Sequence, residues 1–258
     1  MAFRCSQLTK SYPVRGGEVI ALEGIDFSVS ELEFVCIVGP SGCGKTTLLK
    51  IIAGLIKPTC GQIVFSDHDT QEGPLTAMVF QELGLFPWMK VIDNVAFGLE
   101  TRGVDRKQRR ALARNFIERF GLKEFRRSYP HELSGGMRQR VAILRAFLTD
   151  PQILLMDEPF GSLDSQTRMV MQDELLRIWK ENRKTVIYVT HDIEEAILLG
   201  DRVLVMSGRP GMIHADISIP LPRPRQIEDR DLPEFVTLRK QIWKMIEAEV
   251  RRELGATP

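Results

Sequence analysis

A glycine-rich segment at residues 39–47 has the residue types and spacing that bind phosphate. It follows the apolar run 34–38, which predicts a buried strand, and precedes 48–53, which predicts a helix. Glycines let the backbone turn sharply and approach an anion, and amides at a helix N-terminus favour negative charge. In this context the segment predicts a phosphate-binding loop rather than an ordinary glycine-rich turn. Its residues are Gly39, Pro40, Ser41, Gly42, Cys43, Gly44, Lys45, Thr46 and Thr47. We expect Lys45 to reach the β- and γ-phosphates and the Thr46 hydroxyl to bind Mg²⁺.

Two adjacent carboxylates, Asp157 and Glu158, end a second apolar run at 152–156. Metal-assisted phosphoryl transfer needs one carboxylate that supports Mg²⁺ and a base that orients water. Two caps at a strand end would be a structural alternative. Because a phosphate-binding loop is predicted in the same chain, we favour the catalytic interpretation.

Single polar residues follow two further predicted strands. Gln81 comes after the apolar run 77–80, and His191 comes directly after 185–190. The carboxyl ends of strands in an α/β sheet face the ligand crevice. Gln81 is therefore expected to face the ligand crevice. A lone histidine is usually structural, but the strand-end position of His191 favours contact with a γ-phosphate.

A second helix start, at residues 133–140, could also hold an anion. Ser134 can cap the helix, and Gly135 and Gly136 leave amides exposed at its positive end. Taken alone, this segment could be an ordinary N-cap. Asp164 opens a further predicted helix at 166–182.

The remaining elements must hold these groups in place. Residues 3–30 alternate as antiparallel strands do, with a turn at Gly16 and Gly17. Tyr12 is expected in the loop before this turn, where an aromatic ring could stack on a nucleobase; a surface or core tyrosine is the alternative. Residues 91–150 are predicted to be helical, and 234–253 form another helix. Between them, the proline- and arginine-rich residues 207–226 predict an extended surface segment without sheet.

Composition predicts an ordinary globular chain. It has 258 residues, a net charge of +1, 43% hydrophobic and 27% charged residues. No apolar run reaches the roughly 20 residues of a membrane helix, and the N-terminal residues lack the apolar core of a signal peptide, so we expect a cytosolic protein. The four cysteines lack metal-ligand spacing and are expected as free thiols.

Two surface features leave alternatives open. Residues 102–127 carry ten basic and three acidic residues. Such a face could meet nucleic acid or lipid headgroups, but a solvated helix is the favoured interpretation because no aromatic platform is interleaved. The apolar loop 83–88 is expected to be hidden, and would mark a partner site if it were exposed.

With these motifs in hand, the chain resembles the ATP-binding subunit of ABC transporters over nearly its whole length. The phosphate-binding loop together with residues 133–140 is highly specific to ABC ATPases. The resemblance assigns Gln81 to the Q-loop, Met156, Asp157 and Glu158 to the end of the Walker B strand, residues 162–164 to the D-loop, and His191 to the switch histidine. Tyr12 is similar in placement to the adenine-stacking aromatic. Met137 departs from the family, which usually has Gln there.

The resemblance implies an α/β fold with a P-loop NTPase core, a mainly parallel central sheet, an N-terminal antiparallel β subdomain and an inserted α-helical subdomain. It implies one ABC ATPase domain over 1–258. The expected parts are a nucleotide-binding core with the β subdomain at 1–86 and 151–230, a helical signature subdomain at 87–150 and a helical tail at 231–258.

In such proteins two ATP-binding subunits pair head to tail, so each ATP lies between one subunit's phosphate loop and the other's signature helix. The expected cofactors are ATP and Mg²⁺, with Thr46, Gln81 and Asp157 as metal ligands and Glu158, His191 and Gln81 as catalytic residues. Ser134, Gly135, Gly136 and Asp164 complete the nucleotide site.

The expected partners are a second ATP-binding subunit, most simply a second copy of this chain, and membrane permease subunits. An extracytoplasmic solute-binding protein is an indirect partner, and no nucleic acid is expected. The resemblance places the subunit peripherally at the cytoplasmic face of the membrane. Residues 133–140 and 207–213 are similar to importers of nitrate, sulfonates and taurine. An importer of a pyrimidine-type vitamin precursor and a non-transport ABC ATPase are the alternatives.

Overall fold

The computed structural model describes residues 1–66 and 74–253. The chain separates into two compact units, one of residues 1–71 and 184–258 and the other of residues 72–183. Each unit is considered by itself below.

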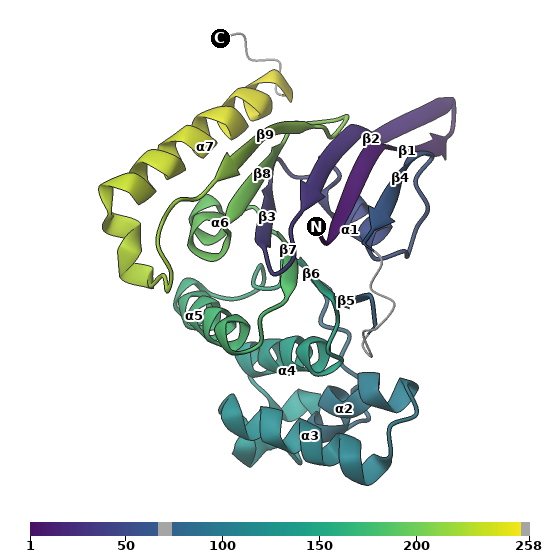
Figure 1. Ribbon diagram of the computed structural model, residues 1–258, viewed down its shortest axis with the longest axis vertical. Helices are drawn as coiled ribbons and strands as arrows, with labels where there is room; N and C mark the ends of the chain where they lie inside the picture. The colour runs from purple at the N-terminus through teal and green to yellow at the C-terminus, as the bar shows by residue number, and fades with distance from the viewer. Residues whose placement is uncertain (67–73, 254–258) are drawn as a thin grey trace. The chain divides into compact units, whose positions relative to one another are not determined.

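The first unit contains an antiparallel sheet with the strand order β2-β1-β4. Its strands are β1 (Phe3–Val14), β2 (Gly17–Val29) and β4 (Cys60–Phe65). Phe3 pairs with Val29, as the predicted hairpin requires, and the turn consists of Arg15 and Gly16, because Gly17 already pairs with Val14. Figure 1 shows β1 and β2 as a long ribbon at the purple end of the colour scale.

The position expected for Tyr12 was wrong, because this residue lies within β1 and pairs with Val19 of β2. Strand β4 accompanies β1 only as far as Thr9. Beyond Thr9 the hairpin continues as a two-stranded ribbon, so Pro13 needs no partner on its other side and does not end the strand.

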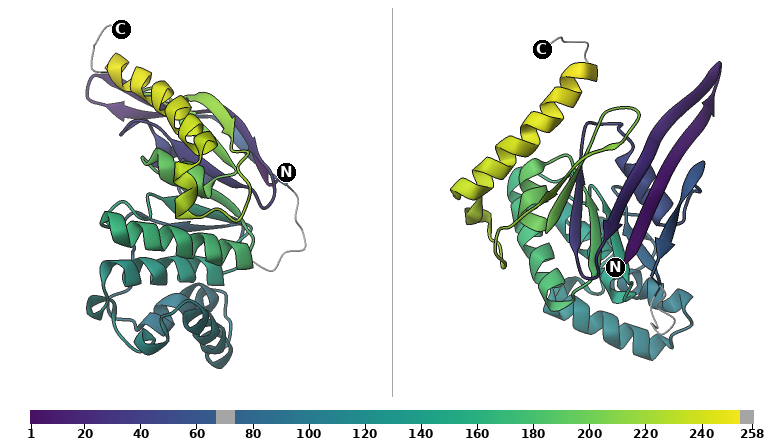
Figure 2. Two further views of the ribbon diagram at one scale, coloured as in Figure 1. Left: turned by 90° about the vertical axis from the view of Figure 1, so that its left-hand side faces the viewer. Right: turned by 45° about the horizontal axis from the view of Figure 1, so that its top comes forward.

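The same unit contains a second set of strands with the order β7-β3-β8-β9. Strands β3 (Phe34–Val38), β7 (Thr185–Val189) and β8 (Arg202–Met206) are parallel, and every residue of β3 and β7 is buried. Helices α1 (Lys45–Ile52), α6 (Ile193–Leu199) and α7 (Pro233–Glu253) and the short η3 (Ile227–Asp231) complete this unit. The views in Figure 2 show α7, in yellow, beside α6 and β9, and α6 contacts α7.

Strand β9 (Ile213–Ser218) corrects the expectation that residues 207–226 contain no sheet. It pairs antiparallel with β8, with Val203 opposite Ile217. The prolines at 210 and 220 flank this strand and leave its own amides intact, so they bound the strand without preventing it.

The second unit combines a parallel strand pair with the predicted helices. Strands β5 (Thr76–Val79) and β6 (Ile153–Asp157) pair with Val79 opposite Met156. The helices are α2 (Val91–Thr101), α3 (Arg106–Arg119), α4 (Gly135–Leu148) and α5 (Ser165–Glu181), with the short turns η1 (Lys123–Phe125) and η2 (Pro130–Glu132). The helical character expected for 91–150 is therefore confirmed.

Several basic residues of α3 form ion pairs with acidic residues of their own unit. Arg110 lies 2.7 Å from Asp93, and Arg109 lies 2.7 Å from Glu100. This pairing agrees with the favoured interpretation of a solvated helix face. Among the described residues, no helix is long and apolar enough to span a membrane.

The apolar loop 83–88 is not hidden, contrary to expectation. Trp88 is 70% exposed, while its neighbour Phe86 packs against Phe97 with ring centroids 4.5 Å apart. The buried Asn94 side chain accepts a hydrogen bond from the Phe86 amide at 2.9 Å and donates to the Phe86 carbonyl at 3.1 Å. These contacts satisfy the loop backbone, so the loop can hold an exposed Trp88 in a fixed place.

Candidate functional site

The loop at 39–47 lies between β3 and α1, as the sequence predicts, and its shape requires glycine. Gly44 has a φ of 101° and caps the N-terminus of α1. A Cβ on Gly44 would lie 2.7 Å from a methyl group of Leu22, and one on Gly39 would lie 2.8 Å from the Met206 carbonyl oxygen. The loop is thus pressed between β2 and the end of β8.

Lys45 lies inside this loop and is only 6% exposed. Its ammonium donates hydrogen bonds to the carbonyls of Gly39, at 2.9 Å, and Pro40, at 2.8 Å. Thr46 follows in the first turn of α1 and is half-buried. A cation, a hydroxyl and the free amides of a helix start therefore converge on one short stretch, which suits a phosphate group.

His191 lies at the same end of the parallel strands as the loop. The amide of Thr190, the residue before it, donates a hydrogen bond to the Ile37 carbonyl at 3.1 Å, so β7 ends beside the end of β3. His191 is exposed, and Asp192 caps helix α6 by accepting the Glu195 amide at 3.1 Å. The structure thus brings His191 and the loop to adjacent strand ends.

Tyr12 belongs to the β1–β2 ribbon and is 39% exposed. The Lys10 ammonium lies 5.1 Å from the centre of the Tyr12 ring. The ring has one cationic neighbour and an open side, a surface that an aromatic base can stack against.

The second unit places the predicted polar residues at the ends of β5 and β6. Val79 pairs with Met156, and Gln81 and Glu158 each follow this pair by two residues along the chain. Asp157 is 4% exposed and Glu158 is half-buried. Glu158 also has a φ of 42°, a left-handed conformation that is costly outside glycine. Such backbone strain is concentrated at functional sites.

The same unit brings two helix N-termini together. Ser134 caps α4 by accepting the Met137 amide at 3.3 Å, which confirms the predicted cap, and Asp164 caps α5 by accepting the Thr167 amide at 3.0 Å. A Cβ on Gly136 would lie 2.9 Å from the Thr167 methyl group, so glycine allows the two helix starts to touch. The hydrogen bond from Thr167 also lowers the pKa of Asp164, which keeps this carboxylate charged.

Sequence reasoning did not find Arg209, which lies against the phosphate loop. Its guanidinium Nε donates to the Gly42 carbonyl at 2.8 Å. The two residues are 167 positions apart, so no local pattern in the sequence could have shown the contact.

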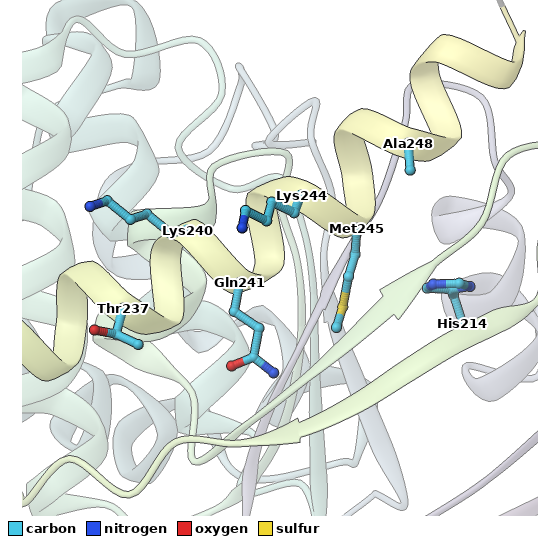
Figure 3. A pocket seen from close by; sticks show the side chains of 7 residues that line it. All are labelled: His214, Thr237, Lys240, Gln241, Lys244, Met245 and Ala248. Atoms are coloured by element: carbon cyan, nitrogen blue, oxygen red, sulfur yellow. The ribbon is translucent and has the colours of Figure 1, made fainter. Parts of the chain in front are cut away.

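One groove in the first unit contains no predicted site residue. It has a volume of about 580 Å³ and lies between α7 and β9, where Gln241 and Met245 of the helix face His214 of the strand (Figure 3). Most of its lining is exposed, so it is an open surface feature.

A parallel α/β core with a glycine-rich loop, an adjoining lysine and paired carboxylates at a strand end defines a phosphate-loop nucleotide hydrolase. The profile of the ABC transporter family matches residues 22–161, and the chain belongs to this family. The resemblance inferred from the sequence is therefore confirmed.

Relatives match over most of the chain. A nitrate import ATP-binding protein of Synechocystis sp. is 41% identical and covers 99% of both proteins. An aliphatic sulfonates import ATP-binding protein of Bacillus cereus is 42% identical over 96% of both. A taurine import ATP-binding protein of Rhizobium johnstonii is 47% identical over 88% of this chain and 89% of its own length.

A solved ATP-binding cassette has the same fold. It is a dimer in a post-hydrolysis state bound to ADP and Pi, and it is 32% identical with a TM-score of 0.74. The match covers 85% of this chain and 100% of the solved one. The predicted fold class, an α/β ATPase core with antiparallel and helical additions, is thus confirmed.

Proposed function

We propose that this chain hydrolyses ATP to energise the import of a small solute through a membrane permease. The observation that carries the proposal is the paired helix start at Ser134 and Asp164, present in a chain that also has a phosphate-binding loop. A phosphate-loop kinase needs only the loop, whereas this second anion-binding surface suits an ATPase that closes on a partner. Relatives named for import of nitrate, aliphatic sulfonates and taurine support the transport role.

In this proposal residues 39–47 bind the triphosphate, with Lys45 neutralising the β- and γ-phosphates. The carbonyls that Lys45 contacts keep its ammonium inside the loop, where a phosphate can exchange for them. Tyr12 stacks on the adenine through the open side of its ring. A partner subunit contributes the other wall through Ser134, Gly135, Gly136 and Asp164.

The donors present suit Mg²⁺. Among the described residues no three His, Cys, Asp or Glu side chains cluster as a metal cage. Mg²⁺ does not need one, since it usually binds one or two protein oxygens together with phosphates and water. The Thr46 hydroxyl, the Gln81 amide oxygen and the buried Asp157 carboxylate are such oxygens. The ion, when bound, offsets the negative charge on the phosphates.

Glu158 is the proposed general base on the attacking water. It is half-buried and lies beyond the strand end, and its left-handed backbone directs the carboxylate away from the direction a regular strand would give. His191 and Gln81 would contact the γ-phosphate and report its loss. Each is placed directly beyond a strand end, where a small change in position can move the following segment.

The proposed assembly has two ATP-binding subunits, most simply two copies of this chain, below two permease subunits at the cytoplasmic face of the membrane. The exposed Trp88 and the loop around it are the proposed permease contact. A solute-binding protein on the far side would act only through the permease, and nucleic acid has no part.

Within the chain, the proposed domain parts are a signature subdomain at 87–150 and a helical tail at 231–258.

Reconstitution tests the proposal. The chain would be purified with candidate permease subunits from the same organism and placed in liposomes, and ATP hydrolysis and uptake of labelled nitrate, taurine or an alkanesulfonate would be measured. Uptake that depends on ATP supports an importer and identifies the solute. Uptake of a pyrimidine precursor instead would select that alternative, and ATP hydrolysis without ATP-dependent uptake in the permease complex would favour a non-transport ATPase.

A further inference from the structure

The segment between β8 and β9, residues 207–212, forms a closed loop behind the phosphate-binding loop. The Ser207 amide donates to the Met212 carbonyl at 3.0 Å, and the Ser207 hydroxyl donates to the Pro210 carbonyl at 3.1 Å while accepting the Met212 amide at 2.9 Å. These hydrogen bonds fix the shape of residues 207–212, which we call the brace loop.

The brace loop is also tied to β2. The Gly211 amide donates to the Ala21 carbonyl at 3.1 Å, and the Glu23 amide donates to the Gly211 carbonyl at 3.0 Å. Its position is therefore set by a strand as well as by its own turn.

Two successive peptides of the phosphate loop present their carbonyls to the brace loop. The Gly42 carbonyl accepts from Arg209 at 2.8 Å, and the Cys43 carbonyl lies so close to Gly211 that a Cβ there would approach it to 2.0 Å. In a trans peptide the N–H points opposite to the C=O. The amides of Cys43 and Gly44 therefore point away from the brace loop. The Cys43 amide donates to the Pro40 carbonyl at 3.4 Å, the same carbonyl that accepts from the Lys45 ammonium, so it lies on the inner side of the phosphate loop.

Helix α7 reaches the brace loop through one buried side chain. Glu249 is 6% exposed, and its carboxylate accepts the Gly208 amide at 3.3 Å. A cavity of about 490 Å³ lies at this junction, lined by residues of the brace loop, His214 and Glu249. A chain of contacts thus runs from α7 through Gly208 and Arg209 to Gly42.

We propose that Arg209 is a positioning residue that orients the Cys43 amide towards the nucleotide phosphates, and that Glu249 holds the brace loop in the place this requires. The inference rests on the proposed role of residues 39–47 as the phosphate site. Without Arg209 the Gly42 carbonyl loses this donor. The Gly42–Cys43 peptide can then rotate more easily, because Gly42 and Gly44 allow a wide range of backbone angles. Nucleotide binding is then weaker, because it must also fix the orientation of this peptide.

The first test measures ADP binding to R209A and R209K by titration calorimetry, together with the melting temperature of each variant. R209A is expected to bind ADP roughly three- to tenfold more weakly, the loss of one hydrogen bond from a charged donor, without a change in melting temperature. R209K retains a cationic donor and recovers part of the affinity, and millimolar guanidinium restores binding to R209A. R4A is the matched control, since Arg4 is exposed on β1 of the same unit.

The second test separates the brace loop from the helix. E249Q keeps an oxygen acceptor for the Gly208 amide and should bind ADP as the unaltered chain does, whereas E249A weakens binding in the same direction as R209A.

K45A tests the proposed function on which the inference rests: if K45A binds ADP normally, the phosphate site itself is wrong. If K45A loses binding and R209A retains it, the positioning role alone is overturned. A lower melting temperature of R209A, together with ADP binding that guanidinium does not restore, also overturns the positioning role.

Discussion

Glu158, the proposed general base, has a backbone conformation that is costly outside glycine. Its φ of 42° is a conformation that non-glycine residues rarely adopt, and Gly161 supports the turn by donating its amide to the Glu158 carbonyl at 3.1 Å. We expect E158Q to keep ATP binding, because an amide of the same size fits the turn, but to lose at least about 100-fold in turnover, since a general base contributes this much or more.

Phosphate release and nucleotide binding are both measured for E158Q. E234Q, which changes an exposed carboxylate at the start of α7, is the control and should match the unaltered chain. Near-normal turnover by E158Q would remove Glu158 as the base.

The cysteines differ in burial, and their reactivity should follow. Cys5, Cys36 and Cys43 are buried, and Cys60 is exposed. Burial raises the pKa of the Cys5 thiol to about 12 and that of Cys36 well above its usual value, so neither forms the reactive thiolate at pH 8. A thiol reagent should therefore modify the folded chain at Cys60 alone, and C60S should show no fast reaction. Fast labelling of C60S would contradict this.

At the residue scale, the sequence predicted groups that lie within recognisable local patterns. Lys45 and Ser134 are each part of a glycine-rich helix start, and both take the local positions expected. Arg209 escaped prediction because its role depends on one carbonyl 167 residues away. Tyr12 was expected in a loop because it comes shortly before the predicted turn, whereas the two-stranded ribbon continues through Pro13 to Val14.

At the scale of elements, Asn94 fixes the position of the exposed apolar loop 83–88, the proposed permease contact. Asn94 fixes the loop backbone from α2, and Trp88 remains 70% exposed. We expect W88E to abolish ATP-driven uptake in the reconstituted complex, because a charge cannot enter an apolar contact with the permease without a partner.

Basal ATP hydrolysis by the isolated W88E chain should be unchanged, since Trp88 lies outside the nucleotide site. L112E, which places a charge at another exposed apolar position of the same unit, serves as the control for surface charge. Normal uptake by W88E would place the permease contact elsewhere.

Arg225 fastens the segment after β9 to the end of α6. It is 4% exposed, and its guanidinium donates to carbonyls of Ile197, at 2.8 Å, and Ile219, at 3.1 Å. Burial lowers its pKa to about 10, which still leaves the guanidinium charged at neutral pH. R225A leaves several buried carbonyls without donors and should lower the free energy of unfolding by roughly 2–4 kcal/mol.

Urea unfolding measures this change, with R15A at the exposed hairpin turn as the control. A loss no larger than that of R15A would show that the carbonyls find other donors. The segment around Arg225 also shows a limit of prediction: its prolines concealed β9, because proline content was counted over the whole stretch although 213–218 contain none.

At the scale of the whole molecule, each chain presents one phosphate loop and one signature helix start. The solved cassette of the same fold is a dimer, and the proposed site takes its loop from one subunit and Ser134 from the other. A two-fold symmetric pair would then contain two equivalent sites, each of which needs both chains. Motifs in one chain could be found from its own residues, whereas the way that they combine between two chains was implied only by the resemblance to ABC ATPases.

Mixing two inactive variants distinguishes a site shared between chains from a site within one chain. K45A damages the phosphate loop, and S134E places a negative charge at the signature helix start, where it repels phosphate. Each variant alone has two defective sites. In a mixed dimer, however, the S134E chain supplies an intact loop that faces the intact Ser134 of the K45A chain. Equal mixing should therefore restore about one quarter of the unaltered hydrolysis rate, because half of the dimers are mixed and each has one of two sites intact. Adding a chain with both changes to the unaltered chain is the control for dilution. No gain over the separate variants would mean that each chain binds ATP without its partner's helix.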